Sequence, residues 1–509
     1  MKADDGVSNI RDLVVIGGGI NGVGIACDAA GRGLSVLLCE AGDLAGATSS
    51  ASSKLIHGGL RYLEHYEFGL VRAALKEREV LMSKAPHLVH PLRFILPQVR
   101  EMRPAWMLRA GLFLYDHLYQ RENIPNSAGI NLASNVAGEP LKDALTSGFT
   151  YWDCATDDAR LVVLNARAAA DLGAEILVRT EVVDGEPERN VWRVRLKDAD
   201  SGKVYEVKAR ALINAAGPWV NDISCRLSRP GPHPEENRNK IRLVKGSHIV
   251  VPRVATGNDA YMLQNDDERI VFVLPFEQDF SLVGTTDVPY SGDSAKASLD
   301  DDEKAYLLDV VARYFSLPPS AEDIVWSFSG VRPLFDEDEN DPSKLSRDYK
   351  LELANVNGQP PLLSVLGGKI TTYRKLSEQA VDMLAPVFPH MKKAWTASHK
   401  LPGGDLIGGS ATSHFEHLCI RYPRIDREVL AALNRRHGSL TEEVLEDCQS
   451  ILDLGEYLGG GLYEQEVLHM KSREWARQPD DVLWRRSKAG LHMSITEREQ
   501  ASDKLAGML

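Results

Sequence analysis

The sequence of 509 residues lacks paired cysteines, long apolar runs and an excess of positive charge. Its six cysteines stand singly, without a CxxC pair, which argues against a zinc site or a redox disulfide. No uninterrupted run of about 18 apolar residues occurs, so no helix is expected to span a bilayer. Acidic residues outnumber basic ones 72 to 59, giving a net charge of −13. That balance excludes a general nucleic-acid binder, which needs a basic face.

The remaining composition is that of an ordinary globular protein, with 43% hydrophobic and 26% charged residues. The polar start, MKADDGVSNI, predicts no secretory signal peptide. The length predicts two to four domains. These features together favour an acidic, soluble, cytosolic protein.

The N-terminal region predicts a β-α-β unit. Residues 12–16 (DLVVI) form a short β-branched run, 20–32 have the small residues of a helix packed on a sheet, and 35–40 (SVLLCE) form a second strand. Further helices are expected at 70–84, 157–173, 301–315 and 369–388, with alternating strands between them. A Pro- and Asn-rich connector is expected at 229–239.

The turn after the first strand fits the dinucleotide motif GxGxxG. Gly17 permits the tight turn, Gly19 lets the backbone approach a pyrophosphate, and Gly22 brings the helix close to the sheet. Glu40 ends the second strand, where an acid accepts hydrogen bonds from a ribose and disfavours a 2′-phosphate. The motif therefore favours FAD or NAD over NADP. The alternative is a glycine turn in an unrelated α/β fold.

Residues 46–63 are dense in serine and glycine, which suits a loop wrapped around a ligand. With this loop the chain resembles the FAD-dependent glycerol-3-phosphate dehydrogenases, the respiratory, quinone-linked group of the D-amino-acid-oxidase-like flavoproteins. The resemblance recurs at separated motifs across nearly the whole chain: AAGPW (215–219), KGSH (245–248), GTTD (284–287), GVRPL (330–334), GGKITTYRKL (367–376) and DDVLWRR (480–486).

The resemblance implies one non-covalent FAD per chain and a specific set of cofactor contacts. These are Gly17, Gly19, Gly22, Glu40, Thr48, Ser49, Ser50, Ser53, Lys54, Leu55, His57, Gly217, Gly368, Lys369 and Thr371. Lys369 follows two glycines and opens the helix expected at 369–388, where a cation and a positive helix end would stabilise the reduced flavin. A solvent-exposed lysine at a helix start is the alternative.

The family's reaction oxidises the C2 hydroxyl of sn-glycerol 3-phosphate to dihydroxyacetone phosphate. A hydride passes to flavin N5 while a base removes the hydroxyl proton. Arg61 and Arg332 are the candidates for binding the substrate phosphate, because arginine matches phosphate oxygens geometrically. The alternatives are a surface ion pair for Arg61 and a domain-bridging pair for Arg332.

Three further residues are candidates for the substrate site. His57 is the first candidate base, because imidazole titrates near neutral pH. Tyr62 and Thr285 are candidate hydrogen-bonding partners for substrate hydroxyls or phosphate, and each could equally be a core or turn residue. No metal site is expected.

The segment 72–109 departs from the acidic average, since it carries eight bases against three acids. Those bases are Arg72, Lys76, Arg78, Lys84, Arg93, Arg100, Arg103 and Arg109. A Trp-, Phe- and Leu-rich helix is expected near 100–119, and this combination is typical of an interfacial membrane contact. A buried helix with exposed arginine neighbours is the alternative from composition alone. The resemblance favours the membrane contact, because these enzymes are monotopic and reduce ubiquinone.

The predicted fold class is α/β, with three domains. A Rossmann-type FAD-binding domain is expected from residues 8–80, 155–240 and 350–395, an antiparallel-sheet substrate domain from 81–154 and 241–349, and a C-terminal helical domain from 400–509. The expected partners are glycerol 3-phosphate, a membrane quinone and the cytoplasmic face of the inner membrane, and a homodimer is one assembly that the resemblance allows. An oxygen-dependent amine or amino-acid oxidase and a non-catalytic flavin sensor are the competing functions.

Overall fold

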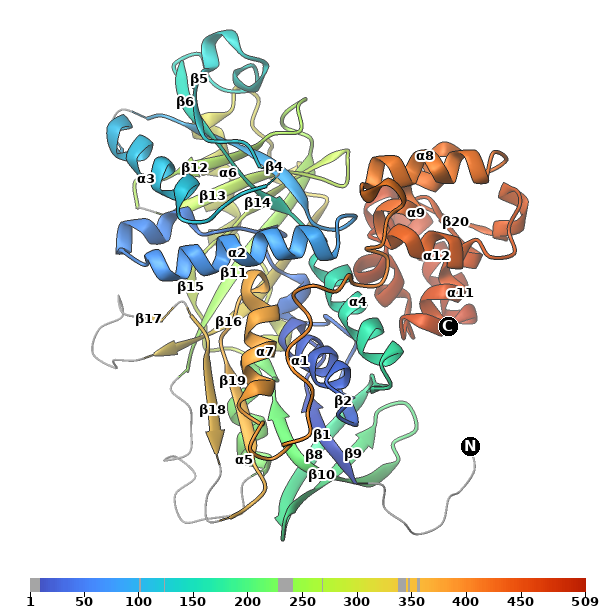
Figure 1. The fold of residues 1–509 in the computed structure, drawn as a ribbon. Helices are drawn as coiled ribbons and strands as arrows, with labels where there is room; N and C mark the ends of the chain where they lie inside the picture. The colour runs from blue at the N-terminus through green and yellow to red at the C-terminus, as the bar shows by residue number, and fades with distance from the viewer. Residues whose placement is uncertain are drawn as a thin grey trace.

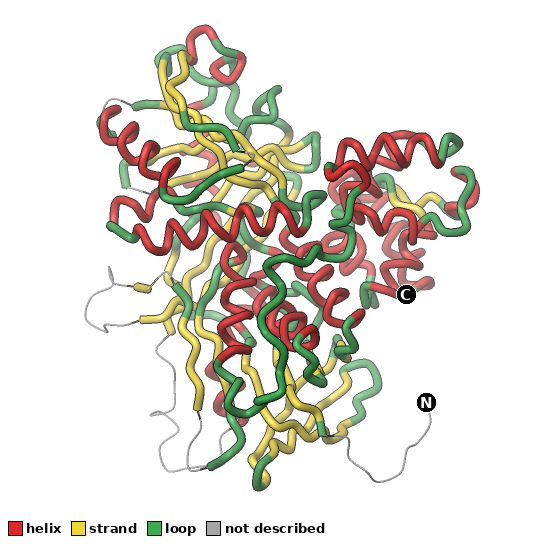
Figure 2. Tube along the Cα trace, in the orientation of Figure 1, coloured by secondary structure: helices red, strands yellow, loops and turns green. Residues whose placement is uncertain are grey.

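The structure is a computed structural model, and it describes residues 10–99, 102–122, 124–227, 241–267, 269–336, 345–346, 348–354 and 358–509. The expected connector at 229–239 lies outside the described residues. Two sheets, one above the other in Figure 1, carry the α/β body, and a helical region lies beside them. Figure 2 shows that this side region is almost entirely helix and loop.

The first sheet contains the predicted β-α-β unit. Its strand order is β18-β19-β10-β1-β2-β7, with β8 and β9 extending from β10. β1 pairs in parallel with β2 and β10, and Val14 and Val15 are fully buried, as in a sheet covered on both faces. The strands are β1 (Arg11–Ile16), β2 (Val36–Cys39), β7 (Glu175–Leu177), β8 (Thr180–Glu188), β9 (Val191–Asp198), β10 (Val204–Asn214), β18 (Lys350–Ala354) and β19 (Leu362–Leu366).

Three helices pack together on one face of this sheet, as the cluster of α1, α4 and α7 in Figure 1 shows. They are α1 (Ile20–Gly31), α4 (Asp158–Asp171) and α7 (Tyr373–Asp382), while α5 (Val220–Leu227) contacts β8. Of the two aspartates at the start of this helix, Asp157 caps α4 by accepting a hydrogen bond from the Arg160 backbone N–H, while Asp158 lies in the first turn. The helix expected at 369–388 is shorter at both ends, because residues 370–372 form a 3₁₀ turn before it and it ends at Asp382.

The second sheet is mostly antiparallel, in the order β17-β16-β11-β14-β13-β12-β4-β6-β3, with β15 beside β11 and β5 beside β6. Alternate residues of β11 serve its two faces: Ile249 and Val251 pack toward α6, and Val250 packs in the cluster that also contains α2 and α3 residues. The strands are β3 (Leu55–Ile56), β4 (His90–Pro97), β5 (Ala128–Asn131), β6 (Ser147–Ala155), β11 (Ile241–Pro252), β12 (Ala260–Gln264), β13 (Ile270–Phe276), β14 (Phe280–Gly284), β15 (Val288–Pro289), β16 (Trp326–Asp336) and β17 (Leu345–Ser346). The helices are α2 (Phe68–Lys84), α3 (Ala105–His117) and α6 (Asp301–Tyr314).

The C-terminal region is helical, as the sequence predicts. It consists of α8 (Ala411–Arg421), α9 (Arg427–His437), α10 (Thr441–Val444), α11 (Glu464–Arg473) and α12 (Ile495–Met508), with a small hairpin of β20 (Tyr457–Gly459) and β21 (Leu462–Tyr463). A short π-helical segment, Asp481–Arg486, precedes α12. The predicted fold class is thereby confirmed, while the domain boundaries stay a prediction.

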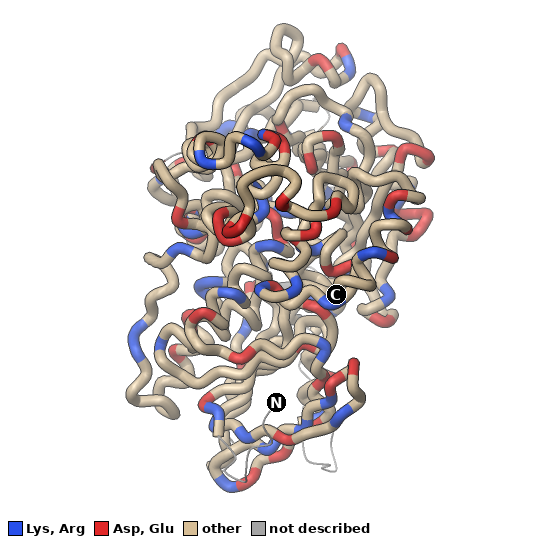
Figure 3. The backbone as a smooth tube through the Cα atoms, turned by 90° about the vertical axis from the view of Figure 1, so that its right-hand side faces the viewer, with Lys and Arg blue, Asp and Glu red and all other residues tan. Residues whose placement is uncertain are grey.

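Charged residues of both signs are interspersed over the side of the molecule that Figure 3 shows. Within the described ranges, no helix is both long enough and apolar enough to cross a membrane.

Candidate active site

A cavity of about 1270 Å³ is lined by residues of both sheets. The first sheet contributes Ile16 and Cys39 at the ends of β1 and β2, and the second contributes His248 and Arg332 from β11 and β16. Carboxyl ends of parallel strands are where open α/β sheets bind ligands. The volume exceeds that of an ordinary small-molecule pocket, so the cavity suits an extended ligand together with a small one.

One end of the cavity has the geometry of a dinucleotide site. Gly17 has a φ of +112°, and a Cβ on Gly22 would lie 1.9 Å from the Gly17 carbonyl oxygen, so the turn and the helix approach both require glycine. Glu40 accepts hydrogen bonds from the backbone N–H groups of Gly18 (2.6 Å) and Gly42 (2.7 Å). Burial raises the pKa of the Glu40 carboxyl, and these two bonds act against that rise.

The serine-rich loop is held along the cavity by its own hydroxyl groups. Thr48 Oγ1 donates to the Val331 carbonyl at 2.7 Å, Ser49 Oγ accepts from the first N–H of α1 at 3.0 Å, and Ser53 Oγ lies 3.0 Å from His248 Nε2. Leu55 also lines the cavity. The loop therefore connects α1 to strands of the second sheet.

Three predicted cofactor residues are not among the described residues that line the cavity: Gly22, Ser50 and Lys54. Gly22 lies inside α1, where it allows close packing. Lys54 is buried and donates to Asp158 (2.7 Å) and to the Ser50 carbonyl (2.9 Å). These residues shape the loop and the helix behind the cavity wall, whereas the other predicted cofactor residues line the cavity itself.

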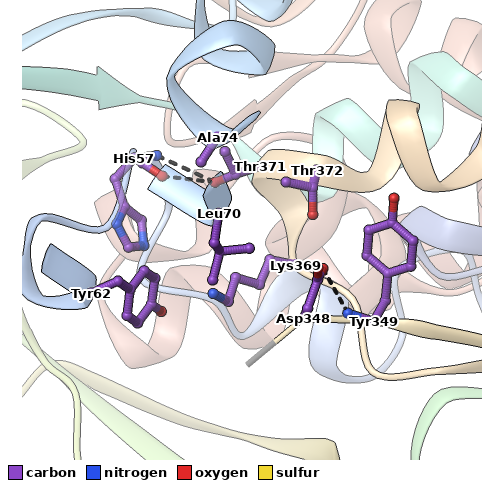
Figure 4. Close-up of a pocket in the computed structure, with 9 residues that line it drawn as sticks. All are labelled: His57, Tyr62, Leu70, Ala74, Asp348, Tyr349, Lys369, Thr371 and Thr372. Carbon is purple, nitrogen blue, oxygen red and sulfur yellow. Dashed lines mark hydrogen bonds between the residues drawn. The ribbon is translucent and has the colours of Figure 1, made fainter. Parts of the chain in front are cut away.

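The six predicted catalytic residues all line the other part of the cavity: His57, Arg61, Tyr62, Thr285, Arg332 and Lys369. Figure 4 shows His57, Tyr62 and Lys369 gathered around a smaller adjoining pocket. The Lys369 ammonium lies 4.0 Å from the centre of the Tyr62 ring. The backbone of His57 exchanges hydrogen bonds with Thr371 Oγ1, which joins this loop to the segment preceding α7.

The environment of His57 favours the neutral form of its imidazole. Burial lowers the pKa of His57, Asp153 acts in the opposite direction, and Lys369 adds to the lowering. Neutral imidazole can accept a proton, so this position suits a general base.

Arg332 and Thr285 meet over Gly246. A Cβ on Gly246 would lie 2.7 Å from Thr285 Oγ1 and 3.1 Å from Arg332 Nη2, so the glycine makes room for both side chains. Arg332 Nη2 also donates to Asp287 Oδ1 at 2.7 Å. Thr285 Oγ1 donates to the Thr286 carbonyl at 3.0 Å, and a guanidinium beside a hydroxyl can bind one anionic group together once that hydroxyl turns toward it.

The buried carboxylate of Glu303 supports the segment that carries Thr285. Glu303 of α6 accepts hydrogen bonds from Ser247 Oγ (2.9 Å) and Thr286 Oγ1 (2.7 Å) and pairs with Lys245 Nζ (3.0 Å). Its side chain therefore fixes the loop that carries Thr285 relative to β11.

Several cavity residues were not singled out from the sequence. Asp153 is buried and accepts from Arg78 (2.9 Å), Tyr115 (2.6 Å) and the Gly58 backbone (3.2 Å), and so fixes the loop beside His57. His248 stacks on Phe328, and burial lowers its pKa to about 3, with Lys54 and Arg332 adding to the effect. Its place in the KGSH motif was the available signal, whereas Asp153 lies in no motif. Arg179, Gln478 and Arg485 also line the cavity.

These features fit a bound FAD. The glycine turn, the helix start and Glu40 form the cradle for the adenosine and pyrophosphate, and the cavity continues from there to the cluster around Lys369.

Comparison with known families agrees with this geometry. The family of FAD dependent oxidoreductases (DAO) matches residues 12–374, and the C-terminal domain of alpha-glycerophosphate oxidase matches residues 394–508. The chain therefore belongs to the FAD-dependent oxidoreductase family, and its cofactor is FAD.

Two relatives and one solved structure match this chain over nearly their whole length. A glycerol-3-phosphate dehydrogenase of Pseudomonas aeruginosa is 52% identical over 97% of this chain and 94% of its own, and the aerobic glycerol-3-phosphate dehydrogenase of Escherichia coli is 49% identical over 97% of both. A solved glycerol-3-phosphate dehydrogenase of Bacillus halodurans, complexed with FAD, is 26% identical with a TM-score of 0.73, covering 98% of this chain and 94% of that one. The resemblance read from the motifs is thereby confirmed.

Proposed function

We propose that the chain oxidises sn-glycerol 3-phosphate to dihydroxyacetone phosphate with FAD. The observation that carries the proposal is the near-full-length identity of about half to glycerol-3-phosphate dehydrogenases. The cavity supports it, because Arg61, Arg332 and Lys369 supply positive charge for a phosphate ester. Bound FAD supplies a hydride acceptor for the C2 hydrogen of the substrate.

The residues divide the remaining work. Arg332 and Arg61 bind the phosphate dianion, and Thr285 donates a hydrogen bond beside Arg332. His57 accepts the proton of the C2 hydroxyl, since its lowered pKa keeps it unprotonated at neutral pH. Lys369 is positioned by its contact with Tyr62 and favours negative charge at this end of the cavity.

Anaerobic addition of glycerol 3-phosphate to the flavin-loaded protein tests this function. We expect the yellow flavin band to bleach, and a quinone analogue to restore it with turnover. Bleaching by amino acids instead would identify an amine or amino-acid oxidase, and a flavin that none of these compounds reduces would identify a sensor.

A second substrate merits the same assay. A D-erythritol 1-phosphate dehydrogenase of Brucella abortus is 47% identical over 96% of both chains. Preferred reduction by erythritol 1-phosphate over glycerol 3-phosphate would replace the three-carbon substrate by a four-carbon one in our proposal.

We also propose that the reduced enzyme passes its electrons to a quinone at the cytoplasmic face of the inner membrane. A surface formed by α3 and the loop of residues 60–66, which precedes α2, supports this, since five large apolar side chains there are exposed: Tyr66 (81%), Trp106 (73%), Met107 (38%), Phe113 (56%) and Leu114 (42%). The loop contacts α3 and also carries Arg61 and Tyr62 of the cavity. An exposed apolar patch beside the cavity is suited to the membrane interface.

The basic segment contributes less to this surface than its sequence suggests. Arg78 and Lys84 are buried, Arg93 pairs with Asp259 at 2.6 Å, and Arg103 pairs with Glu64. Arg100 lies outside the described residues. The exposed bases are Arg72, Lys76 and Arg109, so we assign the contact mainly to the aromatic side chains.

Vesicle binding tests the membrane contact. We expect the double variant Trp106→Ser/Phe113→Ser to lose most sedimentation with anionic vesicles while keeping dye-coupled activity in solution. The matched control replaces two exposed apolar residues of the C-terminal region, Ile420→Ser/Leu452→Ser. Equal binding by both double variants would contradict the assignment.

A further inference from the structure

The C-terminal helical region extends into the wall of the cofactor cavity. Gln478 and Arg485, both beyond residue 400, line the cavity together with Glu40, Asp43 and Arg179. The cavity is therefore built by three parts of the chain, although the dinucleotide motif lies entirely in the first.

Two carboxylates attach this region to the cofactor-binding loops. Asp43 is buried and accepts two hydrogen bonds from Arg486 (both 2.7 Å) and one from Arg485 Nε (2.5 Å). Asp481 is fully buried and pairs with Arg485 Nη2 (2.5 Å) and with Arg179 Nη2 (3.0 Å). Arg485 thus lies between the two carboxylates and faces the cavity.

These contacts place Arg485 at the adenosine end of the cavity. Asp43 follows Glu40, the ribose-binding position, by three residues. The segment that carries Arg179 is also joined to the segment that carries Glu40. Thr180 N–H donates to the Glu40 carbonyl (2.7 Å), and Arg179 N–H donates to the Gly42 carbonyl (2.8 Å). Within the part of the chain that the structure describes, Arg485 Nη1 has no acceptor among protein atoms, so this donor is available to a ligand.

We propose that Arg485 is an FAD-binding residue that contacts the adenosine half of the cofactor, with Gln478 beside it. The C-terminal region then completes the cofactor site and does more than pack against its exterior. This assignment uses FAD alone and does not depend on the identity of the substrate.

The test compares ligands that share or lack the adenosine half. Flavin is removed from the full-length holoenzyme, and FAD, ADP and FMN are titrated back. We expect Arg485→Met to weaken FAD and ADP binding about tenfold, as the loss of a charge-assisted hydrogen bond does, and to change FMN binding by less than about twofold. FAD release from the holoenzyme is expected to accelerate by a similar factor.

Two further variants keep the test decisive. Arg473→Met removes an exposed arginine of α11 that pairs with Glu443, and we expect no change for any of the three ligands. Gln478→Ala leaves the ion pairs of Arg485 intact, and we expect the same selectivity for FAD and ADP with a smaller loss. If Arg485→Met fails to fold, Gln478→Ala alone decides. Equal weakening of ADP and FMN, or unchanged ADP binding in both cavity variants, would overturn the proposal.

Discussion

Replacing Arg332 by methionine removes the guanidinium that we assign to the substrate phosphate. In the described part of the chain, Arg332 makes its hydrogen bonds through Nη2, to Asp287 and to the Thr286 carbonyl. Within that part, Nε and Nη1 have no protein acceptor, so both can donate to phosphate oxygens. Methionine keeps much of the side chain's volume, so the substitution isolates the charge and its hydrogen bonds.

The expected size of the effect follows from these two bonds. A hydrogen bond to a charged group contributes about 1.5–3 kcal/mol, and we take the lower value because the Arg332 side chain is 41% exposed. Two such bonds give about 3 kcal/mol, which is a loss of roughly two orders of magnitude in kcat/KM.

The assay measures dye-coupled oxidation of glycerol 3-phosphate and of glycerol by the same preparations. We expect Arg332→Met to lose activity only toward the phosphorylated substrate, so the preference for glycerol 3-phosphate shrinks about a hundredfold. Arg313→Met is the matched control, because Arg313 is 44% exposed, forms ion pairs with the exposed Asp266 and Asp309, and donates a hydrogen bond to Asn265. An unchanged preference in Arg332→Met, or an equal change in Arg313→Met, would refute the assignment.

Three further outcomes are expected. Glu303→Gln weakens the support behind Thr285 and raises KM for glycerol 3-phosphate several-fold at unchanged flavin content; a drop in flavin content instead would contradict this. Gly22→Ala places a Cβ 1.9 Å from a carbonyl oxygen and yields flavin-depleted protein with a lower Tm, whereas Gly111→Ala meets no atom within 4 Å and changes neither, as absorbance spectra and melting curves would show. Burial would raise the pKa of Glu466, but Arg436 and His437 outweigh burial and hold the pKa at about 2. The stabilisation from this carboxylate is therefore present above pH 4.5 and is lost as the pH falls toward 2. Urea titrations between these pH values would show a flatter dependence in Glu466→Gln.

Local sequence patterns were sufficient for the cofactor end of the cavity. A β-branched strand, three spaced glycines and an acid at the next strand end belong to one continuous β-α-β unit, so their geometry follows from short-range structure. The same reasoning predicted α4, at 157–173, where the helix runs from Asp158 to Asp171. The assigned roles of the individual site residues stay predictions until they are tested.

Pairings between distant segments were not accessible in this way. Thr285 and Arg332 meet because β11 lies between β14 and β16, and nothing local to either residue encodes that register. Asp153 of β6 pairs with Arg78 of α2, and Glu64 pairs with Arg103, so adding charges along 72–109 overstated the basic character of the surface. Arg485 belongs to the DDVLWRR motif, which does not indicate that it lines the cavity. Its position there depends on its ion pairs with Asp43 and Asp481.

The ion pair between Asp43 and Arg486 has a consequence for biosynthesis, because it joins residues 443 positions apart. Chains leave the ribosome from the N-terminus, so the glycine turn and Glu40 are made long before the arginines that neutralise Asp43. During that interval the nascent chain has the nucleotide motif but lacks the last wall of its pocket. We therefore expect a ribosome-bound chain to retain flavin only after nearly all of its residues have emerged, so that cofactor capture reports completed synthesis.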